Sequence, residues 1–265
     1  MKNKKKLSLV IGLVVVLILG IGGFAYTRMK QPAPAPGKET STKKRISEPV
    51  NIIPAAERPV VYIWPVDSRN LSIEVASIKK PASQTEYELE YQAGTLLQGA
   101  FGSIELGALP ARTKILLGSC SAGGACTYHT DIKGGTLLTR FSGGAESYAL
   151  KADWKYFDGK ETQISSKDGK FQLDSKALAR LPFVIIFNGY GYPEGVKGTV
   201  VSEPYTLTSA SSLTGTGNLT LRASEGGATA IMGWDGAKWH EFKATVDGKM
   251  LTAQVDLMQL YVAVK

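Results

Sequence analysis

The chain has 265 residues and a formal net charge of +8, with 43% apolar residues, two cysteines and two histidines. The charge is uneven: residues 1–45 carry ten Lys or Arg and one acid, whereas the rest carries 21 basic and 22 acidic side chains. The large C-terminal part therefore has no overall charge that favours binding to nucleic acid. With two histidines in the chain, few catalytic mechanisms that use histidine as an acid or base are available.

The first element in chain order is an uncharged apolar run at residues 7–26, LSLVIGLVVVLILGIGGFAY. As a helix, twenty residues span about 30 Å, which matches the hydrocarbon core of a bilayer. A cleaved signal peptide is the alternative, but the run exceeds a normal h-region and no clear cleavage motif follows. We expect an uncleaved single-pass anchor in the cell membrane, with residues 1–6 as a cytoplasmic tail and the C-terminal part extracellular.

Residues 27–56 follow as a Pro-rich tether. Their segment QPAPAPGKETSTKKR alternates proline with small and polar residues, which favours extended backbone and cannot bury a core. We expect this tether to hold the C-terminal part away from the bilayer. The lipid bilayer, contacted through residues 7–26, is the first predicted partner of the chain.

Beyond the tether the dominant hydrophobic period is two. In EYELEYQ, Tyr87, Leu89 and Tyr91 share one face of an extended chain, and SYALKADWKYF at residues 147–157 repeats the pattern. Such alternation is typical of antiparallel strands with one buried face. The sequence therefore predicts an all-β ectodomain of antiparallel β-sandwich modules, either Ig-like or prealbumin-like.

Asp-Gly pairs separate the predicted strands and indicate tight turns, at Asp158-Gly159, Asp168-Gly169, Asp235-Gly236 and Asp247-Gly248. The length of this part exceeds one sandwich unit of about 100 residues, which favours two modules. We place them at residues 57–158 and 159–265, with a boundary in 204–212 as the alternative. We expect the second module to end in a four-stranded antiparallel meander.

A short stretch resembles carboxypeptidase-regulatory-like and Cna-B-type modules. SSKDGKFQL, followed downstream by NGYGYPEG, is similar to their turn, strand and aromatic-loop pattern over about thirty residues. The resemblance implies a prealbumin-like β-sandwich.

The stretch GSCSAGGACTYH holds both cysteines, Cys120 and Cys126, around a Gly-Gly pair. The glycines permit a sharp turn that brings the sulfurs together, and an exported domain sits in an oxidising compartment, so we expect a disulfide. A zinc site with His129 and His240 is the first alternative, although the spacing is wider than that of usual structural sites. The second is a nucleophile formed by Cys126 and His129. We predict no metal site and no cofactor.

Four aromatic residues are the best candidates for contact with a ligand or partner: Tyr190 and Tyr192 in NGYGYPEG, and Trp234 and Trp239 in GWDGAKW. Rings in loops combine an apolar face with a polar tip, which suits protein or sugar contacts. The alternative is that the rings pack over their own sheet.

No catalytic motif or acid pair stands out in the sequence. We therefore expect a non-enzymatic surface protein for binding, adhesion or envelope architecture, whose partner is an unidentified envelope protein or surface glycan. A structural subunit of an envelope assembly, of pilus or secretion type, is the first alternative. A carboxylate-dependent hydrolase of cell-surface glycans is the second.

Overall fold

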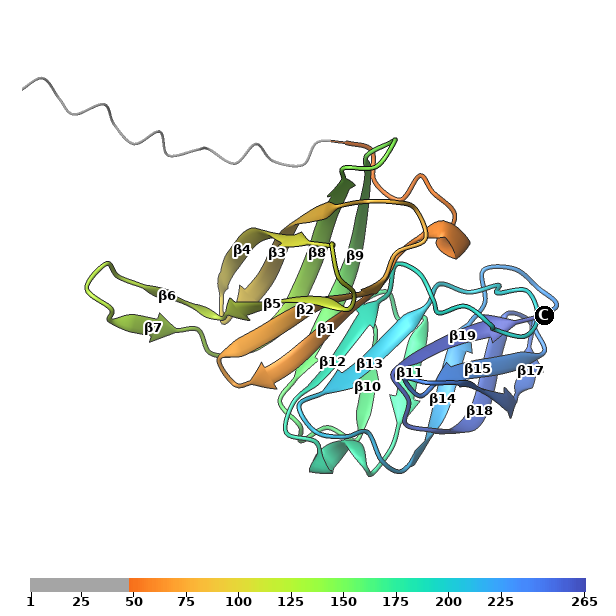
Figure 1. Cartoon of the computed structure of the whole chain (residues 1–265). Helices are drawn as coiled ribbons and strands as arrows, with labels where there is room; N and C mark the ends of the chain where they lie inside the picture. Colours follow the sequence, from red (N-terminus) through yellow and green to blue (C-terminus); the bar gives the residue numbers. More distant parts are fainter. Residues whose placement is uncertain (1–47) are drawn as a thin grey trace, which may run out of the picture. The chain divides into compact units, whose positions relative to one another are not determined.

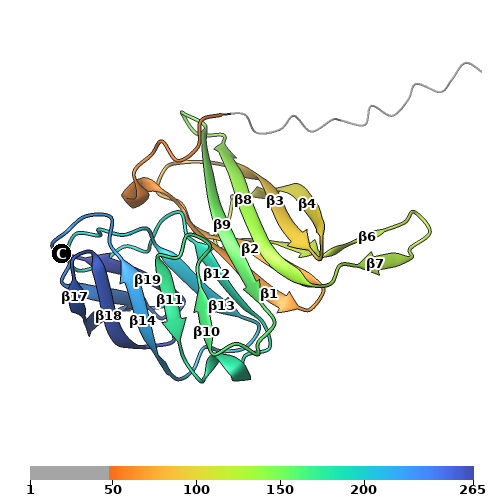
Figure 2. The same cartoon turned by 180° about the vertical axis from the view of Figure 1, so that it is seen from behind.

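The computed structural model describes residues 48–265 (Figures 1 and 2). The predicted tail, membrane span and most of the tether lie outside these residues. Within residues 48–265 the helical elements are two single-turn 3₁₀ helices, η1 (Ala55–Glu57) and η2 (Leu178–Arg180). None of the helices in the described part is long and apolar enough to cross a membrane.

The prediction that the C-terminal part is all-β with antiparallel sheets is confirmed for residues 48–265. A nine-stranded sheet has the strand order β16-β15-β19-β13-β12-β9-β8-β3-β4. Its members are β3 (Gln84–Ala93), β4 (Leu96–Glu105), β8 (Ile132–Ser142), β9 (Tyr148–Phe157), β12 (Val184–Asn188), β13 (Tyr205–Ser209), β15 (Ala230–Trp234), β16 (Trp239–Lys243) and β19 (Leu260–Val264).

Three smaller sheets complete the fold. The first contains β1 (Val60–Asp67), β2 (Asn70–Ser77) and β5 (Ala111–Leu116). The second has the order β10-β11-β14-β18-β17, with β10 (Gln163–Ser165), β11 (Phe171–Asp174), β14 (Thr216–Arg222), β17 (Thr245–Asp247) and β18 (Met250–Asp256). The third is the hairpin of β6 (Gly118–Cys120) and β7 (Cys126–Tyr128), which projects from the body in both views (Figures 1 and 2).

Two large hydrophobic cores lie on opposite faces of the nine-stranded sheet, and β12 contributes to both. Ile185 and Phe187 pack in the first core with β1, β2 and β5, whereas Val184 and Ile186 pack in the second core with β11, β14 and β18. Successive side chains of a strand point to opposite faces. The alternation along β12 therefore makes one long sheet the shared wall of two sandwiches.

The predicted strand pattern places the core correctly. Tyr87, Leu89 and Tyr91 are buried in the first core, as are Leu150 and Trp154 of β9. All four Asp-Gly pairs also lie in turns with the glycine at positive φ, from 58° at Gly248 to 104° at Gly236. Glycine adopts this backbone conformation without the steric penalty that a Cβ atom brings.

The C-terminal strands do not form the expected meander. After the β15–β16 hairpin the chain crosses to the other sheet for β17 and β18, and β19 returns to pair with β15 and β13. All five residues of β19 are buried. A strand without a polar face belongs in the middle of a covered sheet, which explains why β19 does not continue next to β18.

The last residues of the predicted tether are part of the folded body. Val50 forms a parallel bridge with Ala149, and the Asn51 amide exchanges two hydrogen bonds with the backbone of Lys151, at 2.8 and 3.0 Å. Ile53 is buried in the first core, and the Arg58 side chain donates to its carbonyl oxygen. Val50 and Asn51 therefore lie along β9, and Ile53 anchors the segment in the first core.

The described residues, 48–265, belong to one compact unit by their contacts. The nine-stranded sheet contains strands from both sides of the predicted module boundary at residues 158–159. The two cores correspond broadly to the two predicted modules, but the division into separate modules stays a prediction.

Candidate binding site

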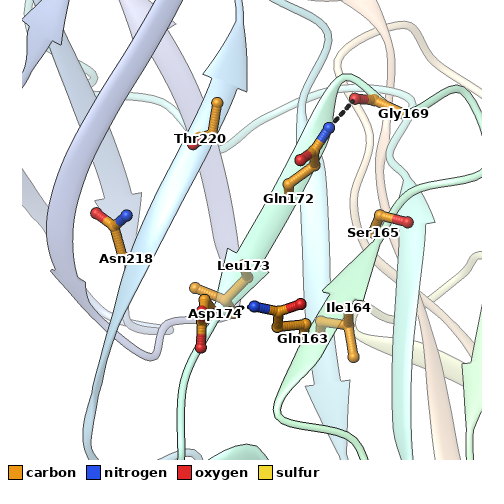
Figure 3. A pocket seen from close by; sticks show the side chains of 9 residues that line it. All are labelled: Gln163, Ile164, Ser165, Gly169, Gln172, Leu173, Asp174, Asn218 and Thr220. Atoms are coloured by element: carbon orange, nitrogen blue, oxygen red, sulfur yellow. Dashed lines mark hydrogen bonds between the residues drawn. The ribbon is translucent and has the colours of Figure 1, made fainter.

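A groove of about 430 Å³ opens on the solvent face of the β10-β11-β14 portion of the five-stranded sheet (Figure 3). Its volume falls within the range of small-molecule sites. The residues that line it are Gln163, Ile164, Ser165, Gly169, Gln172, Leu173, Asp174, Asn218 and Thr220.

The alternation of these strands makes the groove polar. In β11, Phe171 and Leu173 point into the second core, so Gln172 and Asp174 face solvent. In β14, Leu219 and Leu221 are buried, and Asn218 and Thr220 lie on the open face. The same strands that anchor the sheet through their apolar residues thus present polar side chains outward at the alternate positions.

Strand register arranges these side chains in two rows across the sheet. The first row contains Gln163, Asp174, Asn218 and Gln254; the second contains Ser165, Gln172, Thr220 and Thr252. Neighbouring strands lie about 4.8 Å apart, so each row places polar groups at a regular spacing. We call these eight residues the polar rows.

Internal hydrogen bonds fix part of the polar rows. The Gln163 amide donates to the Asp174 carboxylate at 2.8 Å, and the Gln172 amide donates to the Gly169 carbonyl at 3.2 Å (Figure 3). Each primary amide has two N–H donors and a carbonyl acceptor, so these two bonds use only part of the capacity. The remainder can bind a ligand rich in hydroxyl groups.

The turn at one end of the groove is held by Asp168. Burial alone would raise the pKa of this carboxyl, but hydrogen bonds from the Ser166 hydroxyl, the Lys170 backbone N–H and the Tyr205 hydroxyl outweigh it and lower the pKa. The ionised carboxylate therefore ties the β10–β11 turn, including Gly169, to the buried Tyr205 of β13.

Tyr190, the first of the four predicted contact residues, is in the core. It is 1% exposed, its hydroxyl donates to the Leu137 carbonyl at 2.8 Å, and its ring meets Phe187 edge-on. Burial raises the pKa of this hydroxyl. The expectation of a surface ring therefore fails for Tyr190, because the Leu137 carbonyl and the Phe187 ring hold its side chain in the first core.

The other three rings are partly exposed and pack on a third, smaller core of β15 and β19. Trp234 and Trp239 lie 5.5 Å apart, and the Trp239 indole donates to the Glu194 carbonyl at 3.0 Å. Tyr192 packs on the same cluster, with the Lys79 ammonium 4.7 Å from its ring centre. These contacts join the loop after β12 to its own sheet; contact with a partner stays a prediction for the three rings.

The turn between Trp234 and Trp239 is ordered by the Asp235 carboxylate, which bonds to His240. The Asp235 carboxylate lies 2.6 Å from His240 Nε2 and accepts the backbone N–H groups of Ala237 and Lys238. The bond with His240, followed by these backbone bonds, lowers the pKa of Asp235 to about 2. This arrangement orders a β-turn at the surface.

The predicted disulfide between Cys120 and Cys126 is present and joins the two strands of the projecting hairpin. His129 contacts the Tyr91 hydroxyl through Nδ1 at 2.9 Å, and His240 pairs with Asp235. The four residues of the alternative zinc site are thus engaged separately. Across residues 48–265, no cluster of three His, Cys, Asp or Glu side chains could hold a metal ion.

The groove was not identified from the sequence. Its signal is a set of polar residues, all uncharged except Asp174, at alternate positions of QIS, FQLD and TGNLT. This pattern resembles that of any solvated strand until the register aligns the three segments. Comparisons with protein-family models, with curated proteins and with solved structures give no match. The observations that bear on function are therefore the all-β fold, the disulfide and the polar groove.

Proposed function

We propose that this chain is a membrane-anchored surface protein that binds a neutral, hydroxyl-rich glycan without catalysis. The observation that carries the proposal is the pair of polar rows across β10, β11, β14 and β18. Amides and hydroxyls act as both donors and acceptors, as do sugar hydroxyls. Asp174 is the single carboxylate among the nine residues that line the groove, so the ligand need not be charged.

The location is proposed from the sequence. The apolar run at residues 7–26 has the length of a bilayer span, and residues 1–6 carry four lysines suited to the cytoplasmic side. The disulfide is in keeping with an oxidising compartment. The lipid bilayer is thus the first proposed partner and a surface glycan the second, with no role for nucleic acid.

Two alternative functions remain as proposals of lower rank. Strand β4 is a long edge strand of the nine-stranded sheet, and this feature supports the function of a structural subunit of an envelope assembly. A glycan hydrolase would use two carboxyl groups about 5–10 Å apart, and the groove supplies one from Asp174. Assignment of the sandwiches to the Ig-like or prealbumin-like class likewise stays a proposal.

Binding can be tested with the full chain in detergent and insoluble neutral polysaccharides: cellulose, chitin, β-1,3-glucan and mannan. We expect saturable co-sedimentation with at least one of them. Replacing Gln172 and Asn218 together by Ala removes two amides from the groove, each worth about 1 kcal/mol; the dissociation constant should rise at least tenfold. Gln92→Ala, an amide on β3 outside the groove, is the matched control.

Absence of binding to all four polymers, or equal loss with Gln92→Ala, would contradict the glycan proposal. The location is tested separately by labelling intact cells with a membrane-impermeant amine reagent. Exposed lysines such as Lys160 should be labelled before lysis. Labelling only after lysis would exclude an extracellular domain whatever the binding result.

A further inference from the structure

Strand β4 is one end of the nine-stranded sheet. It pairs with β3 over ten residues in a continuous register without a bulge, and no strand of residues 48–265 pairs with its other side (Figure 1). An edge strand directs half of its backbone N–H and C=O groups away from the sheet, where they can pair with another strand.

The other sheet edges in the described part are protected by shortness, charge or proline. Strand β16 has five residues, among them Glu241 and Lys243; β5 carries Arg112 and Lys114; β1 contains Pro65 and two register shifts. Strands β6, β7, β10 and β17 have three residues each. These are the devices by which soluble proteins prevent edge pairing, and β4 lacks them.

Strand β4 also exposes large apolar side chains. Leu97 and Phe101 are each 66% exposed and lie on the same face of the strand, and Leu96 is 63% exposed on the opposite face. The strand has one charged residue, Glu105, at its C-terminal end. A long, regular and apolar edge of this kind favours pairing with a second strand.

We infer that β4 pairs antiparallel with β4 of a second copy of this chain, with Gly99 at the two-fold axis. In a two-fold interface each residue meets a partner set by one register. Centring on Gly99 places Leu97 opposite Phe101 of the other copy, and Phe101 opposite Leu97. Leu96 lies on the other face opposite Gly102, so this register pairs two of the three exposed apolar side chains with each other.

Neighbouring registers fit less well. Centring on Ala100 would place Leu97 opposite Ser103 and Phe101 opposite Gly99, and centring on Gln98 would place Phe101 opposite Thr95. Aromatic and aliphatic cross-strand pairs stabilise sheets, whereas glycine offers a side chain nothing to contact. The register centred on Gly99 is therefore the one that pairs Leu97 with Phe101, apolar with apolar.

The charges are compatible with this arrangement. The two Glu105 side chains would lie twelve positions apart along the seam, about 40 Å at 3.3 Å per residue. Glu90 of β3 is opposite Gly99, so its two copies would be three strand spacings apart, about 14 Å, which exceeds the Debye length at physiological salt. The pairing thus brings no like charges into contact.

The test is disulfide cross-linking of the full chain in its membrane. A Cβ atom added at Gly99 has its nearest neighbour at 3.8 Å, the Leu89 carbonyl oxygen, so Gly99→Cys should fold. The native cysteines are already paired. Mild oxidation should convert Gly99→Cys to a covalent dimer on a non-reducing gel, because the two new sulfurs meet at the axis.

Ser103→Cys is the matched control, on the same face of the same exposed strand. Its two copies would be eight positions apart, about 26 Å, so we expect less than a tenth of the dimer. Adding Phe101→Lys to Gly99→Cys should abolish the cross-link by placing a charge on the edge. A Gly99→Cys thiol that reacts with maleimide yet stays monomeric, or equal cross-linking of the Gly99→Cys and Ser103→Cys variants, would overturn the inference. This outcome is independent of glycan binding.

Discussion

At the scale of the residue, Tyr190 and Tyr192 show how one sequence motif yields two environments. They are two positions apart in NGYGYPEG, yet Tyr190 is buried with its hydroxyl bonded to the Leu137 carbonyl, and Tyr192 is partly exposed beside Lys79. A glycine precedes each ring, so this feature of the local sequence does not distinguish them. The difference arises from the tertiary neighbour, since strand β8 provides the acceptor.

Tyr190→Phe should therefore destabilise the protein by about 1 kcal/mol, the typical net value of one hydrogen bond. In a domain of this size the melting temperature should fall by about 2–4 °C. Tyr192→Phe is the control, and should leave the melting temperature unchanged within error. Equal shifts for both variants in calorimetry would mean that the Tyr190 hydrogen bond contributes nothing measurable.

At the scale of the element, the sequence predicts strands better than it predicts their partners. Alternation identified β3 and β9, and the Asp-Gly pairs located four turns, because both signals are local. The position of β19 between β13 and β15, and the alignment of Gln172 with Thr220 in the groove, depend on pairing between distant segments. No periodicity within one strand specifies such a register.

The β6–β7 hairpin is an element whose sequence and structure agree. The residues from Ser119 to Asp131 are exposed except for half-buried His129. Its contacts with the body include the hydrogen bond of His129 with Tyr91, the Arg69 guanidinium over the Tyr128 ring and a backbone bond from Gly94 to the Asp131 carbonyl at its base. The disulfide therefore stabilises the hairpin itself rather than either core.

Replacing both Cys120 and Cys126 by Ser should remove about 2 kcal/mol from the local stability of this hairpin, by the loop-closure formula for so short a loop. Amide hydrogen exchange at residues 119–131 should accelerate by at least tenfold. Exchange in β8 and β9 should be unchanged, because unfolding of an exposed arm leaves the cores intact. Faster exchange throughout the nine-stranded sheet would show instead that the disulfide supports the whole fold.

At the scale of the whole molecule, the shared sheet couples the two cores. Ile185 and Ile186 are adjacent in β12 and fully buried, but Ile185 faces the first core and Ile186 the second. A side-chain substitution in either core therefore perturbs the same hydrogen-bonded strand, β12.

Ile185→Val and Ile186→Val form a matched pair that tests this coupling. Each removes one methylene and should cost about 1 kcal/mol. If the sheet couples the cores, calorimetry will show a single transition that both variants shift to a similar extent. Two transitions, each sensitive to only one of the variants, would demonstrate independent modules at residues 57–158 and 159–265.

The attachment of residues 48–58 to the body determines how the body would respond to mechanical load. Val50 and the Asn51 side chain bond to β9, Ile53 is buried in the first core, and Arg58 forms an ion pair with Glu203. A pull applied at Glu48 would be borne first by its ion pair with Arg140 of β8 and then by these few contacts, which can separate before any ladder of the large sheet is strained. Under tension this segment would detach before the rest of the body unfolds, which would lengthen the chain by several residues while the groove keeps its shape.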